Sequence, residues 1–243
     1  MKSSLAQLQP AISQAVATAD AAFDGVCTDS RSVAPGNLFV ALRGERFDAH
    51  DFLADVAARG AAAVVVERVP QGLQVPALVV PDTRTALGDI GRWWRSRFAL
   101  PVVGVTGSNG KTTVKEMTAA ILSAAHGPDQ VLATRGNLNN DIGVPLTVFR
   151  LRAGCKAAVI ELGMNHPGEI AVLTRIARPT VALVNNAQRE HQEFMATVEA
   201  VARENGSVIE GLDADGVAVF PADDAYTAIW RELAGTRRTL TFG

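Results

Sequence analysis

The feature that most constrains the fold is a strand, a glycine-containing loop and a helix that follow one another between residues 102 and 125. Residues 102–106 form a β-branched run, and an apolar-periodic segment begins directly after the loop. Glycine permits positive φ angles and a close approach of ligand to backbone, so successive N–H groups can surround an anion where the helix begins. The pattern predicts a nucleotide-phosphate site that comprises Thr106, Gly107, Ser108, Asn109, Gly110, Lys111, Thr112 and Thr113.

The side chains of this loop suit phosphate chemistry. Lys111 would bring positive charge to the terminal phosphates, and the hydroxyl of Thr112 or Thr113 would face a magnesium ion. The common phosphate-loop pattern needs a glycine where this chain has Val105, so an ordinary glycine-rich turn is the alternative. The phosphate reading is favoured because strand, loop, lysine, paired threonines and helix occur together and in the right order.

From residue 100 onward, apolar strands alternate with helices, which predicts a mostly parallel sheet covered by helices. Ligands of such sheets bind at the carboxyl ends of the strands. The expected strands are 102–106, 131–134, 157–162, 181–185 and 216–220, and the expected helices are 111–125, 141–149, 167–177, 197–212 and 223–233.

The first part of the chain reads as a separate small α/β domain. Leu5, Leu8, Ile12 and Val16 recur at helical spacing, and a further helix is expected over 51–59. The expected organisation is an N-terminal domain at 1–82, a connector helix at 83–99 and a P-loop-type central domain at 100–243. Strands of the small domain are expected over 38–42, 63–67 and 77–80.

Composition excludes several classes of function. The chain has 243 residues, 48% of them hydrophobic, and its net charge of -2 argues against a nucleic-acid surface. Arg92, Arg95 and Arg97 are too few for such a surface, and we expect them on a solvated, partly packed helix face. Cys27 and Cys155 lack metal-site spacing and are expected to be reduced. No signal peptide or bilayer-spanning run is present, so we expect a cytoplasmic monomer without membrane insertion.

Polar side chains fall at the carboxyl ends of the expected strands. Glu161 ends an apolar strand and could hold magnesium opposite the loop threonine, or be a solvated strand-end glutamate. His191 lies in a polar segment after the next strand and could be a metal ligand or an ordinary hydrogen-bonded histidine. Asn139 and Asn140 precede a helix, where they could bind a polar ligand or cap that helix.

Taken together, these residues resemble the Mur ligases, which use ATP to add amino acids to the peptidoglycan precursor. The loop at 106–113 is similar to the shortened phosphate loop of that family. Within the family, the resemblance points to the branch that joins D-alanyl-D-alanine to UDP-N-acetylmuramoyl-tripeptide. It rests on residues 136–145 (GNLNNDIGVP), 161–170 (ELGMNHPGEI), 29–31 (DSR) and 36–42 (GNLFVAL).

The resemblance implies roles for individual residues. Lys111 would bind the ATP phosphates, Thr112 or Thr113 with Glu161 would hold a first magnesium ion, and His191 would hold a second. Asn139 and Asn140 would face the substrate near the reacting centre. The uridine-nucleotide end of the substrate would be bound by Ser30, Arg31 and His50.

One position departs from the family pattern. Many members carry a lysine, carboxylated by carbon dioxide, on the helix after the histidine-containing segment, and Asn205 stands there in this chain. Asparagine cannot form a carbamate, so the second metal would be held with less charge or be absent. The family also has a third, C-terminal domain, and the resemblance stops before it, so we expect a fragment of the parent ligase.

The implied reaction is attack of the substrate carboxylate on the γ-phosphate of ATP, followed by displacement of the acyl phosphate by the amine of D-alanyl-D-alanine. Phosphoryl transfer needs charge neutralisation and alignment more than a side-chain nucleophile, and no Ser-His-Asp arrangement is evident. The alternatives are a folylpolyglutamate-type ligase, an ATP-binding module without ligase activity, and a structural protein with a degenerate loop. The uridine-nucleotide domain at 1–82 would not be expected in the first alternative.

Overall fold

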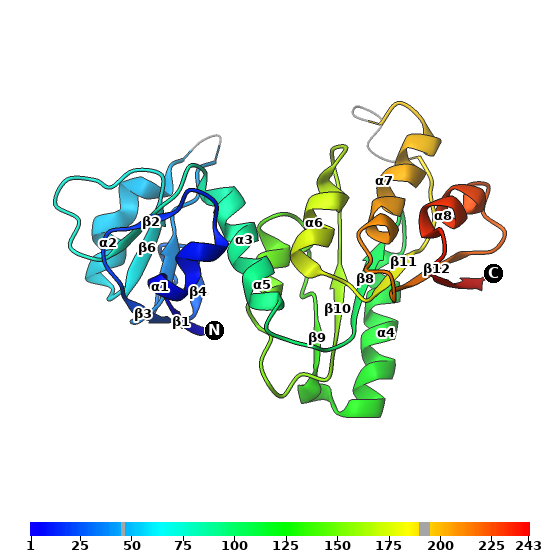
Figure 1. The fold of residues 1–243 in the computed structure, drawn as a ribbon, viewed down its shortest axis with the longest axis horizontal. Coiled ribbons are helices and arrows are strands. Elements are labelled where there is room, and N and C mark those ends of the chain that lie inside the picture. Colours follow the sequence, from blue (N-terminus) through cyan, green and yellow to red (C-terminus); the bar gives the residue numbers. More distant parts are fainter. Residues whose placement is uncertain (45–46, 190–194) are drawn as a thin grey trace. The chain divides into compact units, whose positions relative to one another are not determined.

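The computed structural model describes residues 1–44, 47–189 and 195–243. The chain divides into two compact units, Met1–Trp94 and Arg95–Gly243 (Figure 1). Each unit has its own sheet, so the two are described separately. No helix in the described ranges combines the length and hydrophobicity needed to cross a membrane.

The first unit contains a five-stranded sheet with the strand order β2-β7-β6-β5-β4. The pairs β4·β5, β5·β6 and β6·β7 are parallel, and β2 is antiparallel to β7. A separate antiparallel pair joins β1 to β3. The strands are β1 (Lys2–Ser4), β2 (Val16–Ala17), β3 (Ala22–Asp24), β4 (Val26–Cys27), β5 (Leu38–Val40), β6 (Ala63–Val66) and β7 (Ala77–Val79).

Helices of the first unit are short except for the last. Its core includes Phe39, Leu53 and Val64, which are almost completely buried. The expected helix over 51–59 is present as η2 and α2 and ends before Gly60, whose φ of 88° suits a helix C-terminus. The helices are α1 (Leu5–Leu8), η1 (Gln9–Ala11), η2 (Ala49–Phe52), α2 (Leu53–Ala58) and α3 (Thr83–Arg95).

The helical spacing of the first sixteen residues was misleading. The helix ends by Ala11, and Val16 pairs with Val79 in β2 instead of extending it. Gln14 has a φ of 57°, which is incompatible with a right-handed helix. Val16 is therefore placed by strand pairing, a tertiary interaction that periodicity does not report.

The second unit contains six parallel strands in the order β13-β12-β11-β8-β10-β9, which confirms the expected parallel α/β architecture. Its strands are β8 (Val102–Thr106), β9 (Val131–Ala133), β10 (Ala157–Glu161), β11 (Val181–Val184), β12 (Val217–Pro221) and β13 (Arg238–Phe242). Its helices are α4 (Lys111–His126), η3 (Pro128–Gln130), α5 (Gly143–Val148), α6 (Glu169–Ala177), α7 (Val198–Glu210) and α8 (Thr227–Ala234).

The order of the strands places the loop after β8 at a topological switch point. The connection through α4 runs from β8 toward β9, whereas the connections through α5, α6, α7 and α8 run in the opposite direction along the sheet. Because parallel crossovers are right-handed, α4 covers one face and the other four helices cover the opposite face. Consecutive members of that second group contact one another (Figure 1). A crevice at the carboxyl end of β8 is the usual ligand position in such a sheet.

Arg95 differs from the expected solvated arginine face. Its side chain is buried, and its guanidinium donates hydrogen bonds to the carbonyl oxygens of Phe98, Leu100, Ala177 and Arg178. Burial and the nearby Arg178 charge lower its pKa. Arg95 therefore ties the segment at 98–100 to the end of α6 within the second unit, while Arg92 and Arg97 are exposed as expected.

Candidate functional site

The loop between β8 and α4 presents a row of open backbone donors. Gly107 and Gly110 have positive φ angles of 130° and 75°, and the first bond of α4 runs from the Val114 N–H to the Gly110 carbonyl. Within the described residues, the N–H groups of Gly110, Lys111, Thr112 and Thr113 have no acceptor. Four donors at the N-terminus of a sixteen-residue helix form an anion site.

The residues that follow β11 hold the loop from one side. The Ser108 and Asn109 N–H groups donate to the backbone oxygen and the side-chain oxygen of Asn186, at 3.2 and 3.0 Å. Asn185 and Gln188 add side-chain bonds to Asn109. These contacts were not predicted from the sequence, because they join two loops that are about 75–80 residues apart in the chain.

These contacts also explain where Lys111 lies. In a trans peptide the C=O points away from the N–H, so fixing the N–H groups of Ser108 and Asn109 on Asn186 turns the carbonyls of Gly107 and Ser108 to the other side. The Lys111 Nζ donates to both of these carbonyls. The ammonium group is thus held on the loop by two of its carbonyls.

Glu161 and Thr112 meet at the carboxyl end of β10. The Thr112 Oγ1 donates to the Glu161 Oε2 at 3.0 Å, and the Glu161 side chain is almost completely buried. The Glu161 N–H donates to the Thr134 Oγ1, which fixes the backbone there. A hydroxyl and a carboxylate side by side are the hard oxygen ligands that magnesium takes together with phosphate oxygens and water. These residues therefore fit the metal that the sequence predicts.

Asn139 completes the surroundings of Glu161. Its Nδ2 donates to the Glu161 Oε1 at 2.8 Å, and its carbonyl accepts from the Gly163 N–H. Asn140 instead caps α5, since its Oδ1 accepts from the N–H groups of Ile142 and Gly143. Both asparagines thus have partners within the chain, and a role of either toward substrate remains a prediction.

His191, expected to hold a second metal ion, lies outside the described residues. Among the residues that are described, no group of three or more His, Cys, Asp or Glu side chains could hold a metal ion. Glu169 is the first residue of α6, where burial raises the pKa of its carboxyl but hydrogen bonds from the Asn165 and His166 N–H groups outweigh burial and lower it.

The residues expected at the uridine-nucleotide end lie in the first unit. His50 is buried, its Nδ1 lies 2.6 Å from the Asp48 Oδ1, and its Nε2 accepts from the Glu67 N–H. Burial raises the pKa of Asp48, but the hydrogen bonds and charges of His50 and Arg68 outweigh this and lower it. Both ring nitrogens of His50 are thus already in hydrogen bonds within the first unit, one with the Asp48 carboxylate and one with the Glu67 N–H.

Ser30 and Arg31 lie in the loop after β4. The Arg31 side chain makes two hydrogen bonds to the exposed Asp29 carboxylate, which lowers the pKa of Asp29 to about 2. Such a pair leaves guanidinium edges open to solvent, which is where an anionic ligand could bind.

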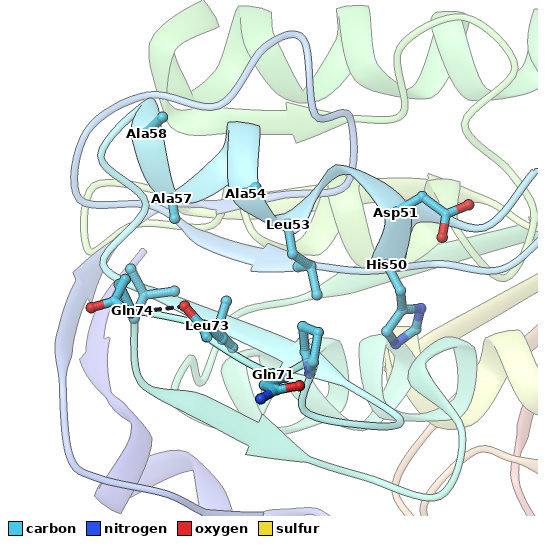
Figure 2. A pocket seen from close by; sticks show the side chains of 12 residues that line it. His50, Asp51, Leu53, Ala54, Ala57, Ala58, Gln71, Leu73 and Gln74 are labelled. Carbon is cyan, nitrogen blue, oxygen red and sulfur yellow. Dashed lines mark hydrogen bonds between the residues drawn. The ribbon is translucent and has the colours of Figure 1, made fainter.

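A cavity of about 520 Å³ opens in the first unit between α2 and the segment at 70–75 (Figure 2). Figure 2 shows His50 and Asp51 at one end, and Gln71 and Gln74 on the segment opposite α2. Its lining is mainly apolar and includes Leu53 and neighbouring alanines of α2. Of the three residues expected at the uridine end, the structure brings His50 to this cavity but not Ser30 or Arg31.

Comparison with protein families matches both units. Residues 105–243, more than half of the chain, match the Mur ligase middle domain, and residues 22–94 match a Mur ligase family catalytic domain. The UDP-N-acetylmuramoyl-tripeptide--D-alanyl-D-alanine ligase of Escherichia coli K12 is 46% identical over 238 residues, which is 98% of this chain and 52% of that protein. The ligase of the same name from Bacillus subtilis 168 is 40% identical over 202 residues, 82% of this chain and 44% of that protein.

Solved structures give the same result. A crystal structure of MurF from Acinetobacter baumannii has a TM-score of 0.92 and 40% identity, and covers 100% of this chain and 54% of that one. MurF ligase from Thermotoga maritima in complex with ADP has a TM-score of 0.81 and 34% identity, and covers 90% of this chain and 50% of that one. The chain spans about half the length of the curated relatives it matches. By its domains, its fold and its relatives, the chain belongs to the Mur ligase family.

Proposed function

We propose that the chain is the nucleotide-binding part of an ATP-dependent ligase of peptidoglycan precursor synthesis. The parent enzyme would join D-alanyl-D-alanine to UDP-N-acetylmuramoyl-tripeptide. The observation that carries the proposal is the group of four open N–H donors, the Lys111 ammonium and the Thr112–Glu161 pair at one switch point. The names of the relatives, at up to 46% identity, supply the substrates.

In the proposed reaction, the terminal carboxylate of the muramyl peptide attacks the γ-phosphate of ATP and ADP leaves. The amine of D-alanyl-D-alanine then attacks the acyl carbon of the resulting acyl phosphate, which forms the amide bond, breaks the C–O bond to phosphate and releases inorganic phosphate and a proton. A carboxylate becomes a good acyl donor only when its oxygen is converted into such a leaving group. The reaction requires binding and alignment, which a rigid phosphate loop supplies.

The chain's own residues would act as follows. Lys111 would exchange its two loop carbonyls for phosphate oxygens, and the open N–H groups of α4 would bind the same anion. Thr112 and Glu161 would hold magnesium, which when bound neutralises charge on the phosphate oxygens. Asn139 would keep the Glu161 carboxylate oriented.

The remaining assignments concern the other ends of the substrates. Residues 1–82, with Ser30, Arg31 and His50, would bind the uridine nucleotide, and 83–99 would connect this domain to the ATP domain at 100–243. His191 would hold a second magnesium ion. No carbamate is proposed, because Asn205 stands at the position of the lysine.

Two calorimetric titrations of the chain test the proposal, one with magnesium ATP and one with UDP-N-acetylmuramoyl-tripeptide. We expect both ligands to bind, and UMP to compete with the muramyl nucleotide. Lys111→Ala should abolish ATP binding and leave the muramyl nucleotide bound, since the two sites belong to different units. Binding of ATP alone would instead support an ATP-binding module, and binding of neither would refute the proposal.

A further inference from the structure

We infer that Asn205 on α7 is a positioning residue of the phosphate loop, which it holds in the conformation that binds nucleotide. The inference rests on the proposed function, because it concerns the same phosphate site. Asn205 is 1% exposed and lies in the interior of α7. Its Oδ1 accepts a hydrogen bond from the Gly107 N–H at 2.9 Å.

Asn205 fixes the first peptide of the loop from one side. The Thr106 Oγ1 donates to the Asn205 backbone oxygen at 3.0 Å, so two consecutive loop residues bond to the same residue of α7. From the other side, the Thr106 carbonyl accepts from the Asn185 N–H at 3.0 Å. The peptide between Thr106 and Gly107 is therefore clamped at its oxygen by the residue after β11 and at its N–H by α7.

The space around Gly107 shows how closely the loop is held. A Cβ placed on Gly107 would lie 3.0 Å from the Asn185 Cβ and 3.1 Å from two backbone nitrogens, in addition to the strain of a φ of 130°. The loop cannot adopt this conformation with another residue, and it has no room to shift toward β11. On the N–H side of the peptide, the direction of the Gly107 N–H is set by its acceptor, the Asn205 amide oxygen.

The bond from the Gly107 N–H to Asn205 is the first of three hydrogen bonds that fix successive N–H groups of the loop. The N–H groups of Gly107, Ser108 and Asn109 all donate into the protein, to Asn205 and Asn186. The N–H groups from Gly110 onward are left open for an anion. Losing the Asn205 acceptor would leave the Thr106–Gly107 peptide held at its oxygen alone, by the Asn185 N–H. The φ angle of Gly107 could then change, which would move the following residues and with them the Gly107 carbonyl that accepts from Lys111.

The neighbouring Glu204 serves a different function, although it is adjacent in sequence. Its carboxylate accepts from the N–H groups of Gly168 and Ile170 at the start of α6, at 2.8 and 2.9 Å. Adjacent helical residues point about 100° apart, so one faces α6 and the other the loop. Glu204 thus offers a matched control, because it lies on the same helix and is buried, and its carboxylate bonds to the start of α6 instead of the loop.

The test compares Asn205→Ala, Asn205→Asp and Glu204→Gln in the full 243-residue chain. Two quantities are measured for each: the affinity for magnesium ATP by calorimetry, and the exchange rate of the Gly107 amide proton by NMR. Asn205→Ala should weaken ATP binding about tenfold and speed exchange at Gly107. Asn205→Asp keeps an acceptor at the same place and should restore slow exchange.

Glu204→Gln should lower the melting temperature but change neither ATP affinity nor Gly107 exchange. Unchanged ATP affinity in Asn205→Ala would overturn the inference, and so would an unchanged Gly107 exchange rate, because either shows that the loop does not depend on this amide. If the unmodified chain failed to bind ATP while the exchange results held, the proposed function would fail and Asn205 would be only a structural support of the loop.

Discussion

Gly163 lies so close to Asn139 that replacing it with alanine should break the hydrogen bond between Asn139 and Glu161. A Cβ on Gly163 would lie 2.8 Å from the Asn139 Nδ2, 2.9 Å from its Cγ and 3.1 Å from its Oδ1. Contacts this short are not tolerated, so the Asn139 amide must move. The atom nearest to the new methyl group is the same Nδ2 that donates to Glu161.

The expected cost follows from the bond that is lost. A hydrogen bond to a charged acceptor contributes about 1.5–3 kcal/mol, and because Asn139 is half-buried we expect somewhat less than this, about 1–2 kcal/mol. For a unit of the size of residues 95–243, this corresponds to a fall in melting temperature of about 2–8 °C. The backbone contributes little, since Gly163 does not have a positive φ.

Scanning calorimetry of four variants separates this mechanism from a general effect of alanine. Gly154→Ala is the matched control, because a Cβ there meets nothing within 4 Å, and it should change stability by less than about 0.5 kcal/mol. Asn139→Ala removes the side chain that is displaced. The double variant Gly163→Ala/Asn139→Ala should be about as stable as Asn139→Ala alone, because the clash is gone. Simple addition of the two single effects would refute the reasoning, and so would a neutral Gly163→Ala.

Three further predictions concern stability. Arg95→Met should cost about 2–4 kcal/mol in chemical denaturation, since it leaves buried carbonyls without a donor, whereas the exposed Arg92→Met should be near neutral. Trp230→Phe should cost about 1–3 kcal/mol in the same assay, because the buried indole N–H donates to the Ala202 carbonyl. Glu169 has a lowered pKa, so it stabilises the fold above the carboxyl's ordinary pKa, and this is lost as the pH falls through the lowered value. Glu169→Gln should therefore reduce the fall in melting temperature at acid pH, by an amount that corresponds to less than about 1 kcal/mol in the free energy of unfolding. An acid side identical to that of the unmodified chain would contradict this.

Much of the second unit could be predicted from the sequence because its signals are local. The strand at 102–106 has the bounds that were expected, and the helix after it begins at Lys111 as expected and ends one residue later than expected, at His126. Apolar runs, glycines and helix-capping residues report on their own segment of chain. The expected helix over 223–233 begins later, at Thr227, because Asp224 and Tyr226 form a turn first.

What the sequence did not reveal depends on partners far along the chain. β13 is exposed along its whole length and is defined by its pairing with β12, so no buried apolar run marks it. Arg95 is buried because four carbonyls converge on it, which composition cannot show. In the candidate site, Thr112 and Glu161 were expected to share a metal and do lie together, but the anchoring by Asn186 and Asn205 was not foreseen.

The N–H groups of the loop fall into a set that is bonded within the protein and a set that is open, and this division affects the free energy of nucleotide binding. Three successive N–H groups are already fixed by side chains and backbone of the same unit, and the next four are open. Among the contacts of the described residues, an incoming phosphate would therefore displace those of the Lys111 ammonium, which bonds to two neutral carbonyls and would gain charged oxygens in exchange. Because the backbone donors are already oriented, little ordering remains to oppose binding, and the electrostatic stabilisation of charge on the phosphate is available at once. The rigidity of the loop thus comes from α7 and the segment after β11, while its affinity for phosphate would come from α4 and Lys111.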